Sequence, residues 1–309
     1  MKVLSLFDGI SCARVALQKL NVNIEKYYAS EIDKYAIQVS KKNWTDIVQL
    51  GDVQELTIKN RWKIGGAGQI DLLIGGSPCQ DLSIAKKNRQ GLNGSRSGLF
   101  WEYVRILKEV KPKYFILENV NSMPREAKDK ITEVLGVEPV MIDAALVSAQ
   151  SRKRLFWTNI PSVVQPEDKK IMLKDILLPE TYTEFDKSFA LTASYNGAVL
   201  WNSIEKSQRT MVWTKPIRVG HFKSGGQGQR VYSIDGKSVT LSALGGGWGA
   251  KTGLYLIKDY ARKLEPIECE RLQSLPDNYT EGLSKNQRRK CLGNAFNVNV
   301  ISHILKNII

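Results

Sequence analysis

The sequence is poor in the residues that build disulfide scaffolds and metal sites. It has four cysteines, Cys12, Cys79, Cys269 and Cys291, and two histidines, His221 and His303. No two cysteines stand at Cys-x-x-Cys spacing, and a disulfide scaffold needs more of them. The same scarcity argues against a zinc site, so we expect no metal.

Long apolar runs are also missing. No stretch reaches the length of a membrane span, and the start, MKVLSLFDG, lacks the architecture of a signal peptide. Residues 2–7 instead form a short apolar run that ends at an Asp-Gly turn, which predicts a first strand. We therefore expect a cytoplasmic protein with no membrane partner.

Acidic residues are too few to balance the basic ones, which leaves a net charge of +14 and a pI near 9.5. Such an excess indicates a polyanionic partner, although a merely basic soluble protein is as compatible with the charge alone. The basic residues gather in three clusters that could converge on one phosphate track. The clusters are Lys86, Lys87, Arg89 and Arg96; Arg152, Lys153 and Arg154; and Lys285, Arg288, Arg289 and Lys290.

Strand and helix patterns alternate through the first half of the chain. This alternation predicts an α/β fold with a Rossmann-like, doubly wound and mostly parallel sheet. The predicted strands are 4–7, 27–30, a short one entering Gly51, 70–76, 114–118, 140–148 and 154–160. The predicted helices are 11–20, 33–43 and 97–111, with an amphipathic helix at 295–308 near the end.

The pattern changes after Pro161, where the chain becomes rich in glycine, serine and tryptophan. Strand patterns in VYSI, VTL and LYLI argue against a low-complexity linker in this region. We therefore predict two domains. Residues 1–160 with 263–309 form the larger one, and residues 161–262 form a smaller, β-rich one.

Polar residues follow five predicted strands, where ligands gather in open parallel sheets. They are Asp8-Gly9, Glu31, Asp52, Ser77-Pro78-Cys79 and Glu118-Asn119. An acid at a strand end is often a helix cap, and that explanation is favoured for Asp52 taken alone. Glu31 lies about 20 residues past the first glycine turn, where an acid binds ribose hydroxyls in dinucleotide folds. No G-x-G-x-x-G is present, which disfavours a nicotinamide oxidoreductase. A nucleoside that lacks a pyrophosphate remains as a candidate ligand.

Cys79 follows Pro78 at the end of a predicted strand. A free cysteine is usually a small buried hydrophobe. Here, however, the polar segment 80–98 follows, with three glycines and four basic residues, as is typical of a mobile lid. A thiol near several cations at a strand–loop junction is where a reactive thiolate is expected. We therefore interpret Cys79 as a nucleophile.

Two further motifs carry charge near predicted strands. Glu118, at the edge of an apolar strand, could keep its proton and donate a hydrogen bond. Arg152 and Arg154 are two residues apart, so in an extended segment both point to the same face. One could contact a base carbonyl and the other a phosphate, and the alternative is that both are ordinary surface arginines.

Several motifs together resemble those of the DNA cytosine-C5 methyltransferases. In order along the chain they are GSPCQDLS (76–83), ENV (118–120), QSRKR (150–154), LEPIECERLQSLPD (264–277) and GNAFNV (293–298). LFDGI near the start, SE (30–31) and GDV (51–53) are similar to the family's cofactor motifs. The SPC-x-DLS form and EPVMID (138–143) look closest to the de novo branch, whereas Gln80 and the complete C-terminal motifs resemble bacterial and phage members.

The resemblance implies a SAM-dependent methyltransferase fold with S-adenosyl-L-methionine as cofactor and S-adenosyl-L-homocysteine as product. Phe7 would stack near the adenine, Glu31 would hold the ribose hydroxyls and Asp52 the adenine amino group. The implied pocket comprises Phe7, Asp8, Gly9, Ile10, Glu31, Ile32, Asp52, Val53, Pro78, Asn294 and Phe296. The family usually has a second glycine where this chain has Ser11-Cys12.

The resemblance also implies a mechanism on a cytosine flipped out of the duplex. The Cys79 thiolate would add to C6, Glu118 would bond the N3 and amine edge, and Arg154 would bond O2. Arg152 joins this implied catalytic set. The base that removes the C5 proton stays open, because a water is as compatible as a side chain.

Residues 161–262 would be the target-recognition domain, and double-stranded DNA the partner of an expected monomer. The implied DNA-binding residues are Gln80, Ser83, Lys86, Lys87, Arg89, Arg96, Gln227, Gln229, Arg230 and Thr240. For the three at 227–230, turn residues on a scaffold are an equal alternative. The setting would be the nucleoid of a bacterial or phage-infected cell, with a cognate restriction enzyme left open. A tRNA cytosine-C5 methyltransferase or an inactive DNA-binding homologue are the alternatives, and the intact Cys79, Glu118 and Arg154 set counts against the second.

Overall fold

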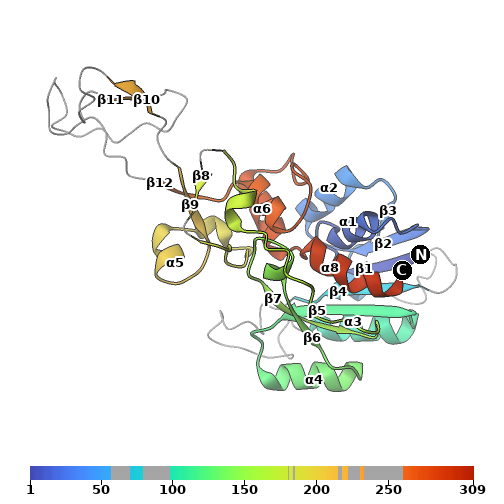
Figure 1. Ribbon diagram of the computed structural model, residues 1–309. Helices are drawn as coiled ribbons and strands as arrows, with labels where there is room; N and C mark the ends of the chain where they lie inside the picture. The colour runs from blue at the N-terminus through green and yellow to red at the C-terminus, as the bar shows by residue number, and fades with distance from the viewer. Residues whose placement is uncertain are drawn as a thin grey trace.

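The computed structural model describes residues 1–56, 70–78, 98–179, 181–183, 185–214, 218–221, 230–232 and 260–309. A seven-stranded sheet with the order β3-β2-β1-β4-β5-β7-β6 forms its centre (Figure 1). Its strands are β1 (Lys2–Leu6), β2 (Lys26–Ser30), β3 (Ile47–Gln49), β4 (Leu72–Gly76), β5 (Tyr114–Val120), β6 (Val140–Asp143) and β7 (Lys153–Thr158). The β1–β2, β1–β4, β2–β3 and β4–β5 pairs are parallel, which confirms the predicted mostly parallel sheet.

Strand β7 runs antiparallel to both of its neighbours, β5 and β6. Its first residues therefore lie at the edge where the parallel strands end. In this register Arg154 stands opposite Val120, and Phe156 opposite Glu118. An arginine from the start of β7 is thus brought to the ligand-binding edge of the sheet.

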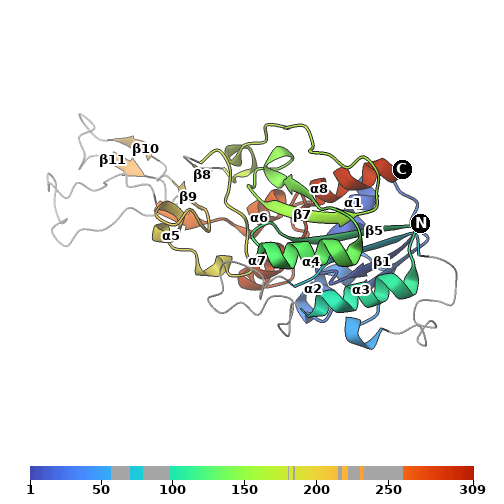
Figure 2. The same ribbon diagram turned by 90° about the horizontal axis from the view of Figure 1, so that it is seen from below.

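Helices cover both faces of the sheet, as predicted (Figures 1 and 2). One face carries α1 (Cys12–Lys19), α2 (Lys34–Asn43) and α8 (Val298–Leu305), and the other carries α3 (Leu99–Val110) and α4 (Arg125–Leu135). Successive strand residues alternate between the two hydrophobic clusters. In β4, Leu72 and Ile74 belong to one cluster and Leu73 to the other. This two-sided burial explains why the strand reads as a continuous apolar run.

The main differences from the sequence-based prediction are two element boundaries and one helix. The strand predicted at 140–148 ends at Asp143, because that carboxylate accepts a hydrogen bond from the Ala145 N–H (3.0 Å) and caps a short 3-10 helix. Helix α8 begins three residues later than predicted, because Asn297 caps it by accepting from Val300 N (3.2 Å). Helix α4 was not predicted, although Gly136 ends it with a left-handed φ of 69°.

The described part of 161–262 contributes a smaller β-rich arrangement to one side of the main sheet (Figure 1). A three-stranded antiparallel sheet has the order β12-β9-β8, and β10 pairs with β11. The bounds are β8 (Thr181–Tyr182), α5 (Leu200–Ile204), β9 (Met211–Thr214), β10 (Arg218–His221), β11 (Arg230–Tyr232) and β12 (Tyr260–Lys263). The VTL and LYLI patterns lie outside the described residues.

The hydrophobic core continues past Pro161. Leu173, Leu191, Tyr195 and Val212 are buried in the same cluster as residues of β1, α1 and α8. The predicted domain boundary at 161 therefore does not coincide with a gap in the core, and the division into 1–160 with 263–309 and 161–262 stays a prediction. The chain then returns through α6 (Pro266–Leu272) and α7 (Lys285–Asn294) to α8.

Candidate functional site

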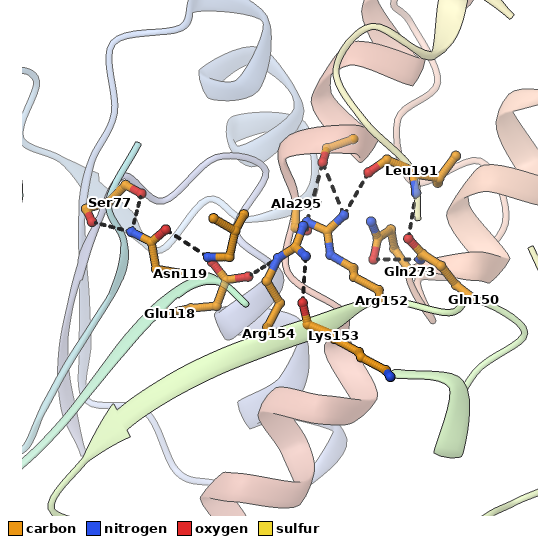
Figure 3. A network of polar contacts seen from close by, with 12 residues as sticks. Ser77, Glu118, Asn119, Gln150, Arg152, Lys153, Arg154, Leu191, Gln273 and Ala295 are labelled. Atoms are coloured by element: carbon orange, nitrogen blue, oxygen red, sulfur yellow. Dashed lines mark hydrogen bonds and ion pairs between the residues drawn. The ribbon is translucent and has the colours of Figure 1, made fainter. Parts of the chain in front are cut away.

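Glu118 and Arg154 form an ion pair at the carboxyl edge of the sheet (Figure 3). The Arg154 Nε lies 2.9 Å from Glu118 Oε1, and the two side chains are 18% and 13% exposed. Arg154 Nη1 also donates to its neighbour's backbone, the Lys153 carbonyl (2.8 Å). Because both side chains are largely enclosed, water screens the pair only weakly and its geometry is well defined. The predicted base-binding residues are therefore brought together.

Asn119 ties the end of β4 to this pair. Its Nδ2 donates to Ser77 Oγ (3.1 Å) and to the Ser77 carbonyl (3.4 Å), while its Oδ1 accepts from Val120 N (2.8 Å). Ser77, which leads into Pro78, is thus held beside the strand that carries Glu118 (Figure 3). Cys79, the next residue in the chain, lies outside the described residues.

Phe296 packs against Gly76 at the end of β4, beside Glu118. A Cβ on Gly76 would lie 2.8 Å from Phe296 Cε1 and 3.3 Å from Glu118 Oε2. Glycine at this position therefore lets the Phe296 ring press against the end of β4. Phe296 is 9% exposed and belongs to the core cluster that includes α8, so a predicted cofactor residue and a predicted base-binding residue both lie beside Gly76.

Glu31 links the ends of β1 and β2. Its Oε2 accepts from Gly9 N (2.8 Å), and its Oε1 accepts from Ile32 N and Asp33 N (2.8 Å each). Ile32, next to the carboxylate, is 70% exposed. A carboxylate beside an exposed apolar side chain suits a ligand with hydroxyl groups and a flat apolar ring.

The turn after β1 is built from left-handed residues. Phe7, Gly9 and Ser11 have φ values of 55°, 60° and 61°. The Asp8 carboxylate is turned inward, where it accepts from Ser11 Oγ (2.5 Å) and Tyr27 Oη (2.7 Å). The bond from Ser11 Oγ offsets part of the cost of the left-handed conformation of Ser11, in the Ser11-Cys12 pair that stands where the family usually has a second glycine.

Three side chains of the implied cofactor pocket face the interior. Asp8 is 4% exposed, Ile10 1% and Val53 4%. Ile10 also offers its carbonyl oxygen to Tyr279 Oη (2.8 Å). Any contact of these residues with a ligand would therefore have to come from backbone atoms.

Asp52 and Asn294 stay near the surface. Asp52 Oδ1 accepts from Gln54 N (3.0 Å) and so caps the 3-10 helix Val53–Glu55, the capping role anticipated for this residue. Asn294 is the last residue of α7 and is exposed. The Lys290 ammonium lies 2.8 Å from Asp33 Oδ2, which ties α7 to the chain just after Glu31.

The structure does not bring Arg152 to the surface expected for a phosphate ligand. The residue is 6% exposed, and its guanidinium donates to backbone carbonyls that include those of Leu191 (2.8 Å) and Ala295 (3.2 Å). Arg152 just precedes β7, which begins at Lys153, but its side chain lines the same pocket as Arg154 and Glu118, as the two-residue spacing predicted. Gln150 and Gln273, which hydrogen-bond in the same network, lie in the QSRKR and LEPIECERLQSLPD motifs, but the sequence assigned neither a role of its own.

The third basic cluster is engaged within the protein. Lys285 pairs with Glu265 (2.9 Å) and Lys290 with Asp33, while Arg288 reaches the buried Glu270 (2.9 Å). Arg289 donates to the Leu264 carbonyl. Each of these four basic side chains therefore has a partner within the protein.

Most predicted DNA-binding residues fall outside the part of the chain that the structure describes. They are Gln80, Ser83, Lys86, Lys87, Arg89, Arg96, Gln227, Gln229 and Thr240, while Arg230 is the first residue of β11. Among the described residues, no group of three or more His, Cys, Asp or Glu side chains is arranged to hold a metal ion. In the same ranges, no helix has the length and apolar character needed to cross a membrane.

The strand order, the antiparallel β7 and the carboxylate at the end of β2 define a class: the SAM-dependent methyltransferase fold. A family model described as C-5 cytosine-specific DNA methylase matches residues 1–309. Type II methyltransferase M.HhaI of Haemophilus parahaemolyticus is 33% identical over 326 residues, which cover 100% of this chain and 94% of that protein. Type II methyltransferase M1.ScrFI of Lactococcus lactis subsp. cremoris is 28% identical, over 100% of this chain and 78% of its own length.

The fold also matches solved structures. The methyltransferase EhMeth of Entamoeba histolytica superposes with a TM-score of 0.68 at 17% identity, and covers 99% of this chain and 97% of its own. The chain belongs to the C-5 cytosine-specific DNA methylase family and is a DNA cytosine-C5 methyltransferase. The predicted family, fold and enzyme class are confirmed.

Proposed function

We propose that the protein methylates a cytosine flipped out of duplex DNA, with S-adenosyl-L-methionine as methyl donor and Cys79 as covalent nucleophile. The observation that carries the proposal is the Glu118–Arg154 pair, 2.9 Å apart, beside the Ser77-Pro78 segment that leads into Cys79. A donor–acceptor pair next to a nucleophile is what addition to an electron-poor ring requires.

Each residue has a defined task in this proposal. The Cys79 thiolate forms a bond to C6 of the base, which makes C5 nucleophilic. Arg154 donates to O2, and Glu118 bonds the N3 and amine edge, so both stabilise charge that develops on the ring. After methylation, loss of the C5 proton lets the C6–sulfur bond break and returns the thiolate. Asn119 acts by positioning Ser77-Pro78 and thereby Cys79.

The residues at the ends of β1 and β2 fit a nucleoside cofactor. Glu31 retains lone pairs that suit ribose hydroxyls, and the exposed Ile32 with the half-buried Phe7 offers apolar contact to a ring. Asp52 and the exposed Asn294 supply further polar groups, while Pro78 and Phe296 would close the pocket toward Cys79. S-adenosyl-L-methionine, when bound there, supplies the methyl group.

We propose double-stranded DNA as the substrate and residues 161–262 as the recognition region. The net charge of +14 favours a polyanion, and the basic residues of segment 80–98 are the predicted phosphate contacts. The name of M.HhaI as a type II methyltransferase supports a role beside a restriction enzyme. In this proposal the protein acts as a monomer at the nucleoid.

A methyl-transfer assay tests the proposal. The protein is incubated with methyl-labelled S-adenosylmethionine and either duplex DNA or tRNA. We expect label in duplex DNA only, and none when Cys79→Ala replaces the wild-type protein. Label that appears only in tRNA would overturn the substrate assignment.

Cys291→Ser provides the matched control, because Cys291 is a buried thiol outside the proposed catalytic set. Burial raises the pKa of the Cys291 thiol to about 12, so it stays protonated and unreactive at neutral pH. This variant should retain methyl transfer. Equal loss of transfer in Cys79→Ala and Cys291→Ser would contradict a specific role for Cys79.

A further inference from the structure

Gln150 and Arg152 hydrogen-bond the two backbone groups of one residue, Leu191, within the proposed recognition region 161–262. Leu191 N donates to Gln150 Oε1 (2.8 Å), and the Leu191 carbonyl accepts from Arg152 Nη1 (2.8 Å). The two segments that carry these residues lie side by side just before Leu191. There Ser151 N donates to the Ser188 carbonyl, and Ser188 N donates to the Ala149 carbonyl (2.8 Å each). The segment around Leu191 is therefore fixed to the chain that enters β7.

The same two side chains also reach the C-terminal segment (Figure 3). Arg152 Nη2 donates to the Ala295 carbonyl (3.2 Å) and lies 3.5 Å from the Gly293 carbonyl oxygen. Gln150 Nε2 donates to the Leu272 carbonyl (3.3 Å) and to Gln273 Oε1 (3.4 Å). Arg152 thus joins the Leu191 segment to the residues on both sides of Asn294.

Backbone packing supports this junction independently. A Cβ on Gly293 would lie 2.2 Å from the Thr192 carbonyl carbon, 2.4 Å from its oxygen and 2.5 Å from Ala193 N. No side chain fits at these distances. Glycine is therefore required for the end of α7 to pack directly on the chain after Leu191.

The electrostatics of the junction explain the choice of arginine. Helix α7 ends at Asn294, so carbonyl groups of its last turn lack partners within the helix. A cation at this end also interacts favourably with the helix dipole. A planar guanidinium can donate to several carbonyls at fixed angles, whereas an ammonium offers a single point of charge. Burial of Arg152 costs solvation, and these hydrogen bonds offset that cost.

We infer that Gln150 and Arg152 are positioning residues that clamp the Leu191 segment of the recognition region onto the cofactor pocket. The Leu191 segment is held on one side of the clamp, and Asn294 and Phe296 on the other. Arg154, two residues along the chain, pairs with Glu118. Loss of the clamp should therefore displace Phe296 and Glu118, the residues beside Gly76 that would contact the cofactor and the flipped base. This inference rests on the proposed function for the identity of both ligands.

Two substitutions of Arg152 separate a clamp from a phosphate ligand. Arg152→Lys keeps the charge but cannot make the same set of carbonyl contacts, and Arg152→Gln removes the charge. We expect both to weaken binding of S-adenosylhomocysteine by about tenfold to hundredfold, measured by calorimetry well below the melting temperature. A variant that is only less stable would bind with unchanged affinity under those conditions.

The salt dependence of duplex DNA binding is the second readout. Loss of one phosphate contact lowers the slope of log K against log salt by about 0.9. We expect Arg152→Gln to leave this slope unchanged. Lys153→Gln, which removes the same charge from an exposed neighbour, is the matched control and should leave the S-adenosylhomocysteine affinity unchanged.

Two results would overturn the clamp. One is a slope reduced by about 0.9 in Arg152→Gln, and the other is wild-type S-adenosylhomocysteine affinity in both Arg152 variants. If the Arg152 variants do not fold, Gly293→Ala tests the same junction with the cation retained, and the same loss of cofactor affinity is expected. Failure of the wild-type protein to bind S-adenosylhomocysteine would instead count against the proposed function.

Discussion

Two partly buried side chains, Glu118 and Arg154, carry the chemistry proposed for the target base. Their 2.9 Å ion pair is placed by the register of antiparallel β5 and β7, not by closeness in sequence. Each side chain orients the other, so the two should act as one unit. Their roles can be separated from simple binding by measuring the turnover of each variant.

Glu118→Gln and Arg154→Gln should each lower kcat by about 10²–10³, because each removes a group that stabilises charge on the ring. The double variant should be little worse than either single one, since residues that act as a unit are not additive. Single-turnover methylation of duplex DNA measures this. Fully multiplicative losses would show that the two residues act independently.

The buried Asp8 carboxyl should make the stability of the protein depend on pH. Burial raises its pKa from 3.8 to about 6, with the nearby Glu31 adding to the rise, while hydrogen bonds from Ser11 and Tyr27 oppose it. A carboxyl whose folded-state pKa is raised is protonated in both states below about pH 4. The folded state then loses stability as the pH rises from about 4 to about 6, by about 3 kcal/mol in total.

Asp8→Asn should remove most of this dependence. The free energy of unfolding, measured by urea denaturation between pH 4 and pH 8, should fall with pH in the wild-type protein relative to the variant. The difference between the two should level off above about pH 6. A difference that is the same at every pH would contradict a raised pKa at Asp8.

At the scale of strands and helices, the sequence predicted most of the sheet. Buried strands such as β4 and β5 were recognisable because they are covered on both faces and read as apolar runs. The boundaries at Asp143 and Asn297 were missed because one side-chain cap decides each of them. Helix α4 was missed although Gly136 marks its end.

The site was predicted less completely than the sheet. Residues at strand ends were found because the topology of a parallel sheet brings such ends together. The interior positions of Asp8, Ile10 and Val53, and the junction made by Arg152, depend on long-range packing. A local pattern in one sequence does not encode such contacts. Arg152 and Ala295, for example, are more than a hundred positions apart in the chain.

Gly76→Ala tests the contact between β4 and the C-terminal segment. The added Cβ would lie 2.8 Å from Phe296 Cε1, so the ring and the adjacent Glu118 carboxylate must move. We expect kcat to fall at least tenfold and stability to drop by about 1–3 kcal/mol. Phe296→Leu in the same protein should restore part of the loss. Methylation rates and thermal melting check this, and wild-type activity in Gly76→Ala would contradict the close contact.

At the scale of the whole molecule, the positive charge is not equally available to DNA. The cluster on α7 is paired within the protein through Glu265, Glu270 and Asp33. The 86–96 cluster and Lys153 are the remaining candidates for phosphate contact. Composition alone could not separate these groups, because pairing depends on which acids the fold brings beside each base.

Charge substitutions in the two clusters should therefore behave differently. Lys86→Gln and Arg89→Gln should each reduce the slope of log K against log salt for duplex DNA by about 0.9. Lys285→Gln and Lys290→Gln should leave that slope unchanged. Fluorescence anisotropy over a salt series measures all four, and a reduced slope in the α7 variants would contradict the internal pairing as their main role.

The most direct test of the account is to map the covalent link to the target base. Duplex DNA that contains 5-fluorocytosine blocks loss of the C5 substituent and so traps the enzyme on the base. After incubation with S-adenosylmethionine and proteolysis, mass spectrometry should find the modified base on the peptide that contains Cys79. A link to Cys12, Cys269 or Cys291, or methylation of DNA without any covalent link, would contradict the account.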